Sequence, residues 1–162
     1  MLEFCLRIGG KPVRTPAPHE FDCEVDPREV LKHWEEFKRN LAEARQYSRI
    51  YFGTDYAYFF AYPEEGEYGF ALVEYTRPMS EEEMSRLQEK VEDVFISTLG
   101  EAGFEPEFHY LPEVEAWEFY DGSTRVDVEA RVHKPDLDLL DDIAVKMLRI
   151  REKIWRLLRR PS

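Results

Sequence analysis

Acidic and basic side chains alternate along residues 127–131, whose sequence is DVEAR. In an extended strand alternate residues point to the same face, so Asp127, Glu129 and Arg131 would lie side by side. Glu118, on the preceding segment, would join them if the two segments form a hairpin. Metal-dependent phosphate hydrolysis needs several such carboxylate oxygens around a divalent cation. Glu118, Asp127 and Glu129 therefore indicate either a phosphohydrolase site or, in a chain rich in acids, a solvated sheet face.

The usual catalytic and cofactor motifs are missing from the sequence. The four histidines have no HExxH spacing, the two cysteines form no CxxC pair, and no serine lies in a nucleophile-elbow context. Gly9 and Gly10 precede a lysine, but the segment is too short for a phosphate-binding loop. We therefore expect no metal and no cofactor, and the chain leans towards a non-catalytic function.

Aromatic residues are concentrated on both sides of a predicted hairpin loop at residues 63–67. If Tyr62 pairs with Tyr68, one face of the hairpin carries the large rings and the other carries mainly small residues. The large face is either a surface that stacks on bases or contacts a protein, or part of the core. This interaction face would consist of Tyr56, Tyr58, Phe60, Tyr62, Tyr68 and Phe70.

Basic residues are concentrated near the C-terminus. Residues 146–160 carry seven basic side chains and one acid, and five of the seven fall on one side of a helix, beside its apolar face. This basic stripe could bind phosphates, or its cations could stabilise the C-terminal end of the helix and pair with an acidic body. The stripe consists of Lys146, Arg149, Lys153, Arg156 and Arg160.

Trp155 and Leu148 lie outside the main apolar stripe of the same helix. Either the helix is buried on two sides, or this edge contacts a second subunit of a homo-oligomer.

Two cysteines, Cys5 and Cys23, are too few for a disulfide framework. We expect buried thiols, as is usual in a reducing cytosol. A disulfide stays possible if residues 2–8 and 20–25 pair as a hairpin that brings the two sulfur atoms together.

A second hairpin is predicted around Asp121 and Gly122, a dipeptide favoured in tight turns. With two or four residues in the turn, Trp117 and Phe119 would share a face with Val126 and Val128. Glu118 would then share the opposite, wet face with Asp127.

Helix signals mark residues 27–46, the segment from Ser80 to Gly100, and the basic C-terminal helix at about 138–160. Period-two alternation or β-rich composition predicts the strands 2–8, 20–25, 49–53, 56–62, 68–76, 113–120 and 125–133. The order ββα-ββ(β)α-βββα predicts an α+β fold: an antiparallel sheet of about six to seven strands with three helices on one face. One domain over residues 1–162 is expected.

The chain has 34 acidic and 22 basic residues, a net charge of −12, and outside residues 146–160 the net charge is −18. Such a surface repels nucleic acid and anionic membranes, so nucleic acid could bind only at the basic stripe. Few amides beside many Glu and Arg are typical of thermophile proteins. No apolar run is long enough to span a membrane and no signal peptide is recognisable, so a cytoplasmic protein is expected.

These features favour a small acidic binding or regulatory protein that contacts a basic protein surface. One version is a viral or host inhibitor that occupies a basic groove by imitating phosphate spacing. The alternatives are a nucleic-acid-binding protein that uses the basic stripe, and the metal-dependent phosphohydrolase.

Overall fold

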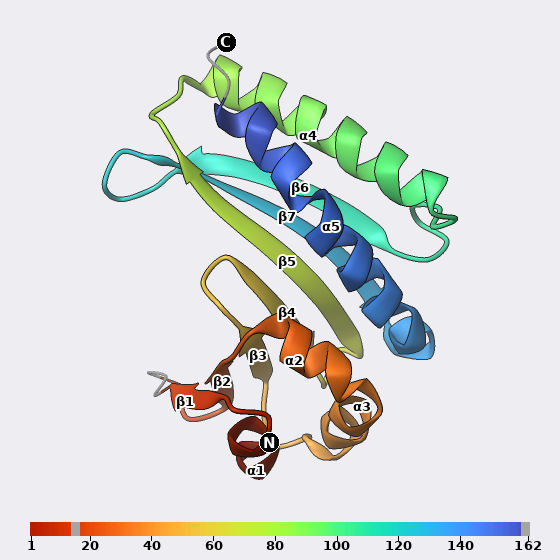
Figure 1. Ribbon diagram of the computed structural model, residues 1–162. Coiled ribbons are helices and arrows are strands. Elements are labelled where there is room, and N and C mark those ends of the chain that lie inside the picture. Colours follow the sequence, from red (N-terminus) through yellow and green to blue (C-terminus); the bar gives the residue numbers. More distant parts are fainter. Residues whose placement is uncertain (14–16, 160–162) are drawn as a thin grey trace. The chain divides into compact units, whose positions relative to one another are not determined.

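The computed structural model describes residues 1–13 and 17–159. It confirms the predicted fold class: the chain is α+β, with a seven-stranded, mostly antiparallel sheet in the order β1-β2-β3-β4-β5-β7-β6 (Figure 1). β2 and β3 pair in parallel, whereas β1–β2 and β3–β4 are antiparallel.

The strands are β1 (Lys11–Val13), β2 (Glu20–Glu24), β3 (Arg49–Gly53), β4 (Ala57–Tyr62), β5 (Glu67–Thr76), β6 (Leu111–Glu118) and β7 (Thr124–His133). The helices are α1 (Leu2–Arg7), α2 (Pro27–Lys32), α3 (Trp34–Glu43), α4 (Glu81–Glu101) and α5 (Leu140–Arg159), with a short 3₁₀ helix, η1 (Lys134–Leu139), before α5. Five α-helices replace the three predicted, because residues 2–7 are helical and the segment 27–46 divides at His33 into α2 and α3.

The chain forms two compact units. Unit 1 contains residues 1–71 and 131–141, and unit 2 contains residues 72–130 and 142–162. Strands β5 and β7 each contribute residues to both units.

The core of unit 1 is a cluster of aromatic rings from helices and strands. The Phe37 ring lies 5.2 Å from that of Phe52 and 5.8 Å from that of Phe4. Phe59 on β4 contacts Phe70 on β5, with ring centroids 4.7 Å apart. Each of these rings is at most 2% exposed, so α1, α3 and three strands are joined through one aromatic core.

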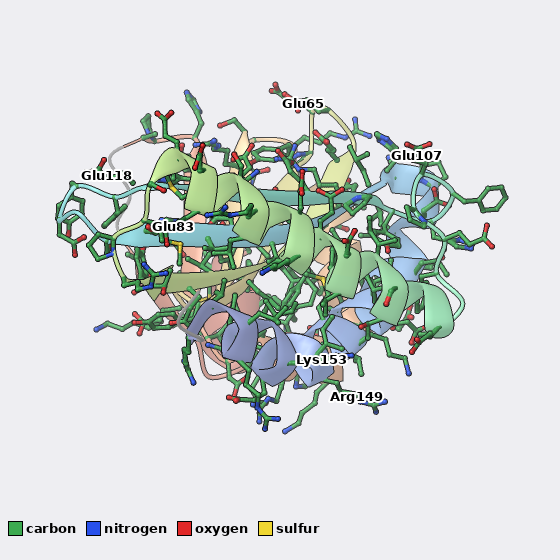
Figure 2. All side chains as sticks on the ribbon, turned by 90° about the horizontal axis from the view of Figure 1, so that it is seen from above. Glu65, Glu83, Glu107, Glu118, Arg149 and Lys153 are labelled. Carbon is green, nitrogen blue, oxygen red and sulfur yellow. A yellow bond between two sulfur atoms is a disulfide. The ribbon has the colours of Figure 1, made fainter. Side chains whose placement is uncertain are left out.

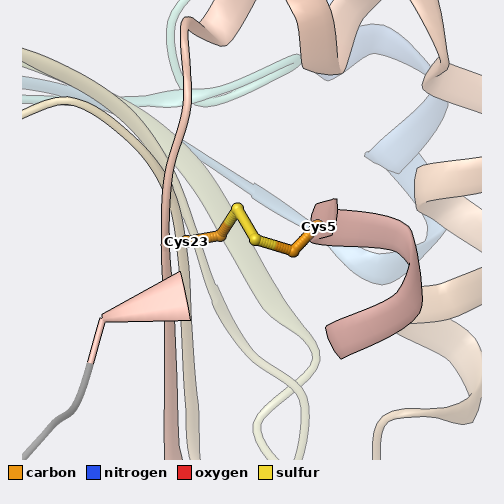
Figure 3. Close-up of a disulfide and its surroundings, with 2 residues drawn as sticks. All are labelled: Cys5 and Cys23. Carbon is orange, nitrogen blue, oxygen red and sulfur yellow. A yellow bond between two sulfur atoms is a disulfide. The ribbon is translucent and has the colours of Figure 1, made fainter. Parts of the chain in front are cut away.

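A disulfide between Cys5 and Cys23 ties α1 to β2, with Cα atoms 6.0 Å apart (Figure 3). Both cysteines are fully buried, and a side chain on Gly10 would collide with the Cys23 sulfur. The expectation of two free thiols is therefore wrong. The sulfur atoms meet although the segment around Cys5 is a helix and not the strand that the alternative required.

The alternation of Leu2, Phe4, Leu6 and Ile8 was misleading. Leu2 and Leu6 are 50% and 57% exposed, whereas Phe4, Cys5 and Ile8 are buried, which is a helical spacing. A short apolar segment fits either periodicity, and here the disulfide and the contact of Phe4 with the aromatic core accompany the helix.

Unit 2 contains α4 and, from residue 142 onwards, α5. Ser80 and Glu83 form the predicted capping box at the start of α4, in which Ser80 Oγ accepts from the Glu83 backbone N–H. Leu87, Val91, Phe95 and Leu99 form the buried stripe of α4. The buried side chains of α5 include Ile143, Met147, Ile154 and Trp155.

Candidate functional site

The hairpin of β6 and β7 has a register different from the one predicted. The backbone N–H of Phe119 donates to Ser123 O at 2.7 Å, so three residues, Tyr120 to Gly122, form the loop. Gly122 has a φ of 89°, as expected at the end of a three-residue hairpin loop. An odd number of loop residues moves every side chain of one strand to the other face.

The corrected register separates the predicted carboxylate set. Trp117 shares a face with Arg125, whose guanidinium lies 5.2 Å from the Trp117 ring, instead of with Val126 and Val128. Alternation then places Glu118 on the face opposite Asp127 and Glu129. Figure 2 shows Glu118 at the loop end of β6. Among residues 1–13 and 17–159, no three acidic, histidine or cysteine side chains are grouped so as to hold a metal ion.

Four carboxylates do share one face of this hairpin, two from the predicted set and two from β6, and we call them the acidic face: Glu113, Glu115, Asp127 and Glu129. The pKa of Glu115 is raised, first by a hydrogen bond with the side chain of Glu113, then by burial, and then by the charges of Glu113, Glu129 and Asp127. Sequence reasoning missed Glu113 and Glu115. Assuming a three-residue loop that ends at Gly122 would have placed both residues on the same face as Asp127 and Glu129.

Arg125 lies at one end of the acidic face, between aromatic rings. Its Nε donates to Asp127 Oδ1 at 2.9 Å, and its Nη1 donates to the Tyr75 hydroxyl at 3.3 Å. Burial raises the pKa of Asp127, and the hydrogen bond from Arg125 opposes this shift. The ring of Phe119 packs on Tyr75 at 5.1 Å. The acidic face is thus bordered by half-buried aromatic side chains.

The predicted aromatic interaction face does not exist as one surface. Phe70 contacts Phe59 and lies in the core, and Tyr68 is 3% exposed. Only four residues, 63–66, separate β4 from β5, one fewer than predicted, and this shift turns Tyr68 and Phe70 to the other side.

The other rings of the predicted interaction face lie in a row along β4. Tyr58, Phe60 and Tyr62 follow one another at centroid distances of 6.3 and 5.6 Å. Phe60 is 4% exposed, with the Arg131 guanidinium 5.5 Å from its ring. Tyr56 precedes β4 and is 47% exposed. This row is therefore mostly covered, with Tyr56 as its exposed end.

Arg49 covers the ring of Tyr62 at this surface. The Arg49 guanidinium lies 5.6 Å from the Tyr62 ring and pairs with Glu20 at 3.5 Å. Burial, followed by the neighbouring Tyr62, raises the pKa of Tyr51 to about 12. Tyr51, Tyr62 and the paired guanidinium of Arg49 form a packed surface and not an open stacking platform.

The basic stripe is exposed on α5. Arg149, Lys153 and Arg156 are exposed and Lys146 is half-buried, while Arg160 lies outside the described residues. Figure 2 shows Arg149 and Lys153 pointing away from the rest of unit 2. None of these four described cations has an ion pair within residues 1–13 and 17–159, whereas Arg159 lies 3.8 Å from Glu74.

Trp155 makes the buried side of α5 wider than the apolar stripe recognised in the sequence. It is 1% exposed, so α5 is buried on two sides, the first of the two alternatives. The buried arc is wider than the apolar stripe alone, and the cations therefore lie opposite it.

No protein-family model, no curated protein and no solved structure matches this chain. In the described ranges, no helix combines the length and the apolar character that a membrane span needs. What the chain does has therefore to be inferred from the chemistry of its own surfaces.

Proposed function

We propose that the protein is a binding protein whose acidic face contacts a basic surface of another protein. The observation that carries this proposal is the position of four carboxylates on one face of the hairpin, where a hydrogen bond with Glu113, burial and the neighbouring charges raise the pKa of Glu115. Their mutual repulsion is relieved when a cationic surface approaches, so a basic partner gains affinity there and an acidic one is repelled.

The surroundings of the acidic face support a protein partner. Trp117 and Phe119 are half-buried beside it, and Tyr120 at the hairpin tip is 90% exposed. Aromatic side chains are enriched at protein interfaces, because they provide a large contact area at low entropy cost. An inhibitor that occupies a nucleic-acid-binding groove is one form that such a protein could take.

A lysine decapeptide carrying a fluorophore serves as the probe. Its affinity for the wild type is compared with that for Glu115→Lys, and with that for Glu89→Lys, a control with the same charge change at an exposed position of α4. We expect Glu115→Lys to weaken binding about tenfold and the control to weaken it far less. Equal losses in both variants would show general attraction to an acidic protein and overturn the proposal.

A second candidate is a polyanion-binding surface on α5, and the observation that favours it is the solvent-facing row of Arg149, Lys153 and Arg156. Three phosphate contacts to a single strand predict a fall in affinity of about 20-fold between 50 and 200 mM salt. Changing all three residues to Glu should abolish binding of labelled single-stranded DNA. The matched control changes Arg45, Arg86 and Lys90, which are also exposed, to Glu. Unchanged binding in the first triple variant would end this candidate.

A further inference from the structure

Strand β6 is the last strand of the sheet, so one side of its backbone has no neighbouring strand among residues 1–13 and 17–159. Because Phe119 N–H bonds to Ser123 on the β7 side, alternate residues back along β6 also turn their backbone groups towards β7. The backbone groups of Val114 and Ala116 therefore point away from β7. Such an open row of donors and acceptors is where an additional strand would pair.

The side chain of Gln88, on α4, occupies that row. Its Nε2 donates to Val114 O at 3.3 Å, and its Oε1 accepts from the Ala116 N–H at 3.0 Å. A carboxamide carries a donor and an acceptor side by side, as a peptide group does. Gln88 thus occupies the acceptor and the donor that a neighbouring strand would use.

The placement of Gln88 is fixed by packing. α4 runs alongside β6 (Figure 1), and its residues Leu87 and Val91 are 8% and 0% exposed. These anchors hold Gln88 at the strand edge. Pro112, near the start of β6, has no N–H, so it offers no donor to an incoming strand.

We infer that Gln88 closes the β6 edge and thereby prevents β6 of a second copy from pairing with it. This inference goes beyond the proposed function, because it concerns the strand edge and not the acidic face. A pairing that used Val114 O and Ala116 N–H in both copies would place Glu115 opposite Glu115. Charge repulsion is therefore a second barrier, and removing it should strengthen any association that follows the loss of Gln88.

The test replaces Gln88 by Met, which keeps the length and volume of the side chain but removes both hydrogen bonds. Sedimentation analysis over a range of concentrations should show self-association of Gln88→Met, stronger association of Gln88→Met with Glu115→Gln, and wild-type behaviour of the exposed control Gln46→Met. Adding Ala116→Pro to Gln88→Met should reverse the association, because it deletes the exposed N–H.

A folded Gln88→Met variant whose mass equals that of the wild type at every concentration would overturn the inference, as would association that Ala116→Pro leaves unchanged. If Gln88→Met does not fold, hydrogen exchange of the Ala116 amide in the wild type provides the test. The Ala116 amide should exchange slowly, and exchange as fast as that of Tyr120 in the hairpin loop would contradict a hydrogen bond to Gln88.

Discussion

The two units stabilise their cores by different means. Unit 1 is built from short elements, with six-residue helices α1 and α2 and a three-residue strand β1, and it contains the disulfide and the aromatic cluster. Unit 2 contains the 21-residue helix α4, with its capping box, and residues 142–159 of the 20-residue helix α5. Helices as short as α1 are unstable alone, so packing and the covalent link must hold them, whereas long amphipathic helices bury more apolar surface each.

Truncating the aromatic core of unit 1 should have the largest effect on stability. Phe52→Ala removes a fully buried ring that contacts Phe4, Phe21 and Phe37, and we expect a loss of about 3–5 kcal/mol in the free energy of unfolding. Urea denaturation measures this loss. The control Phe108→Ala, at a side chain that is 77% exposed, should change stability little. Equal effects would contradict the core assignment.

Removing the disulfide should come next. Cys5→Ser with Cys23→Ser opens a link between residues 18 apart, which predicts a loss of about 3 kcal/mol. Hydrogen exchange followed by mass spectrometry should show faster exchange in unit 1 and little change in α4. A reducing agent that reaches the buried sulfur atoms should reproduce the effect in the wild type. Faster exchange in α4 than in α1 would contradict a link that acts on unit 1.

Breaking the ion pair of Arg125 with Asp127 in unit 2 should have a smaller effect. Arg125→Met leaves the nearly buried Asp127 carboxylate without its hydrogen-bond donor, and we expect a loss of about 2 kcal/mol at neutral pH. The loss should diminish as the pH falls, because protonation neutralises Asp127. Arg125→Met with Asp127→Asn should recover part of the stability, and failure to do so would show that packing of Arg125 on Trp117 and Tyr75 is the larger contribution.

The smallest effect concerns Glu115, whose pKa is raised in the folded state. The folded protein therefore holds this proton to a higher pH than the unfolded chain does, and stability falls as the pH rises from the ordinary carboxyl pKa through the raised one. Glu115→Gln removes this dependence, so its stability relative to the wild type should increase with pH through that window. Thermal unfolding at several pH values measures the difference. A difference that is flat with pH would contradict the shift.

Much of the fold could be predicted from local patterns. Ser80 with Glu83 predicted the start of α4, and the stripe from Leu87 to Leu99 predicted its buried face. The aromatic and β-branched segments predicted β3, β4, β5 and β7 to within a few residues. These signals are read within a few residues of sequence, so no distant contact is needed to interpret them.

The surfaces were predicted less well, because which side of a strand is buried depends on loop length. The loop between β4 and β5 is one residue shorter than predicted, so Phe70 faces the core. The loop between β6 and β7 has three residues instead of the predicted two or four, so Glu115 and not Glu118 lies on the acidic face. Both errors come from the period of two along a strand.

The sequence by itself determined the class of fold, the capped helix and the charge difference between the C-terminal segment and the rest of the chain, since composition and local spacing are enough for these. Tertiary structure decided the helical state of residues 2–7, the link from Cys5 to Cys23 and the partners of Gln88. Each of these depends on groups distant in sequence that folding brings into contact, and a short segment has too little intrinsic preference to decide its own state.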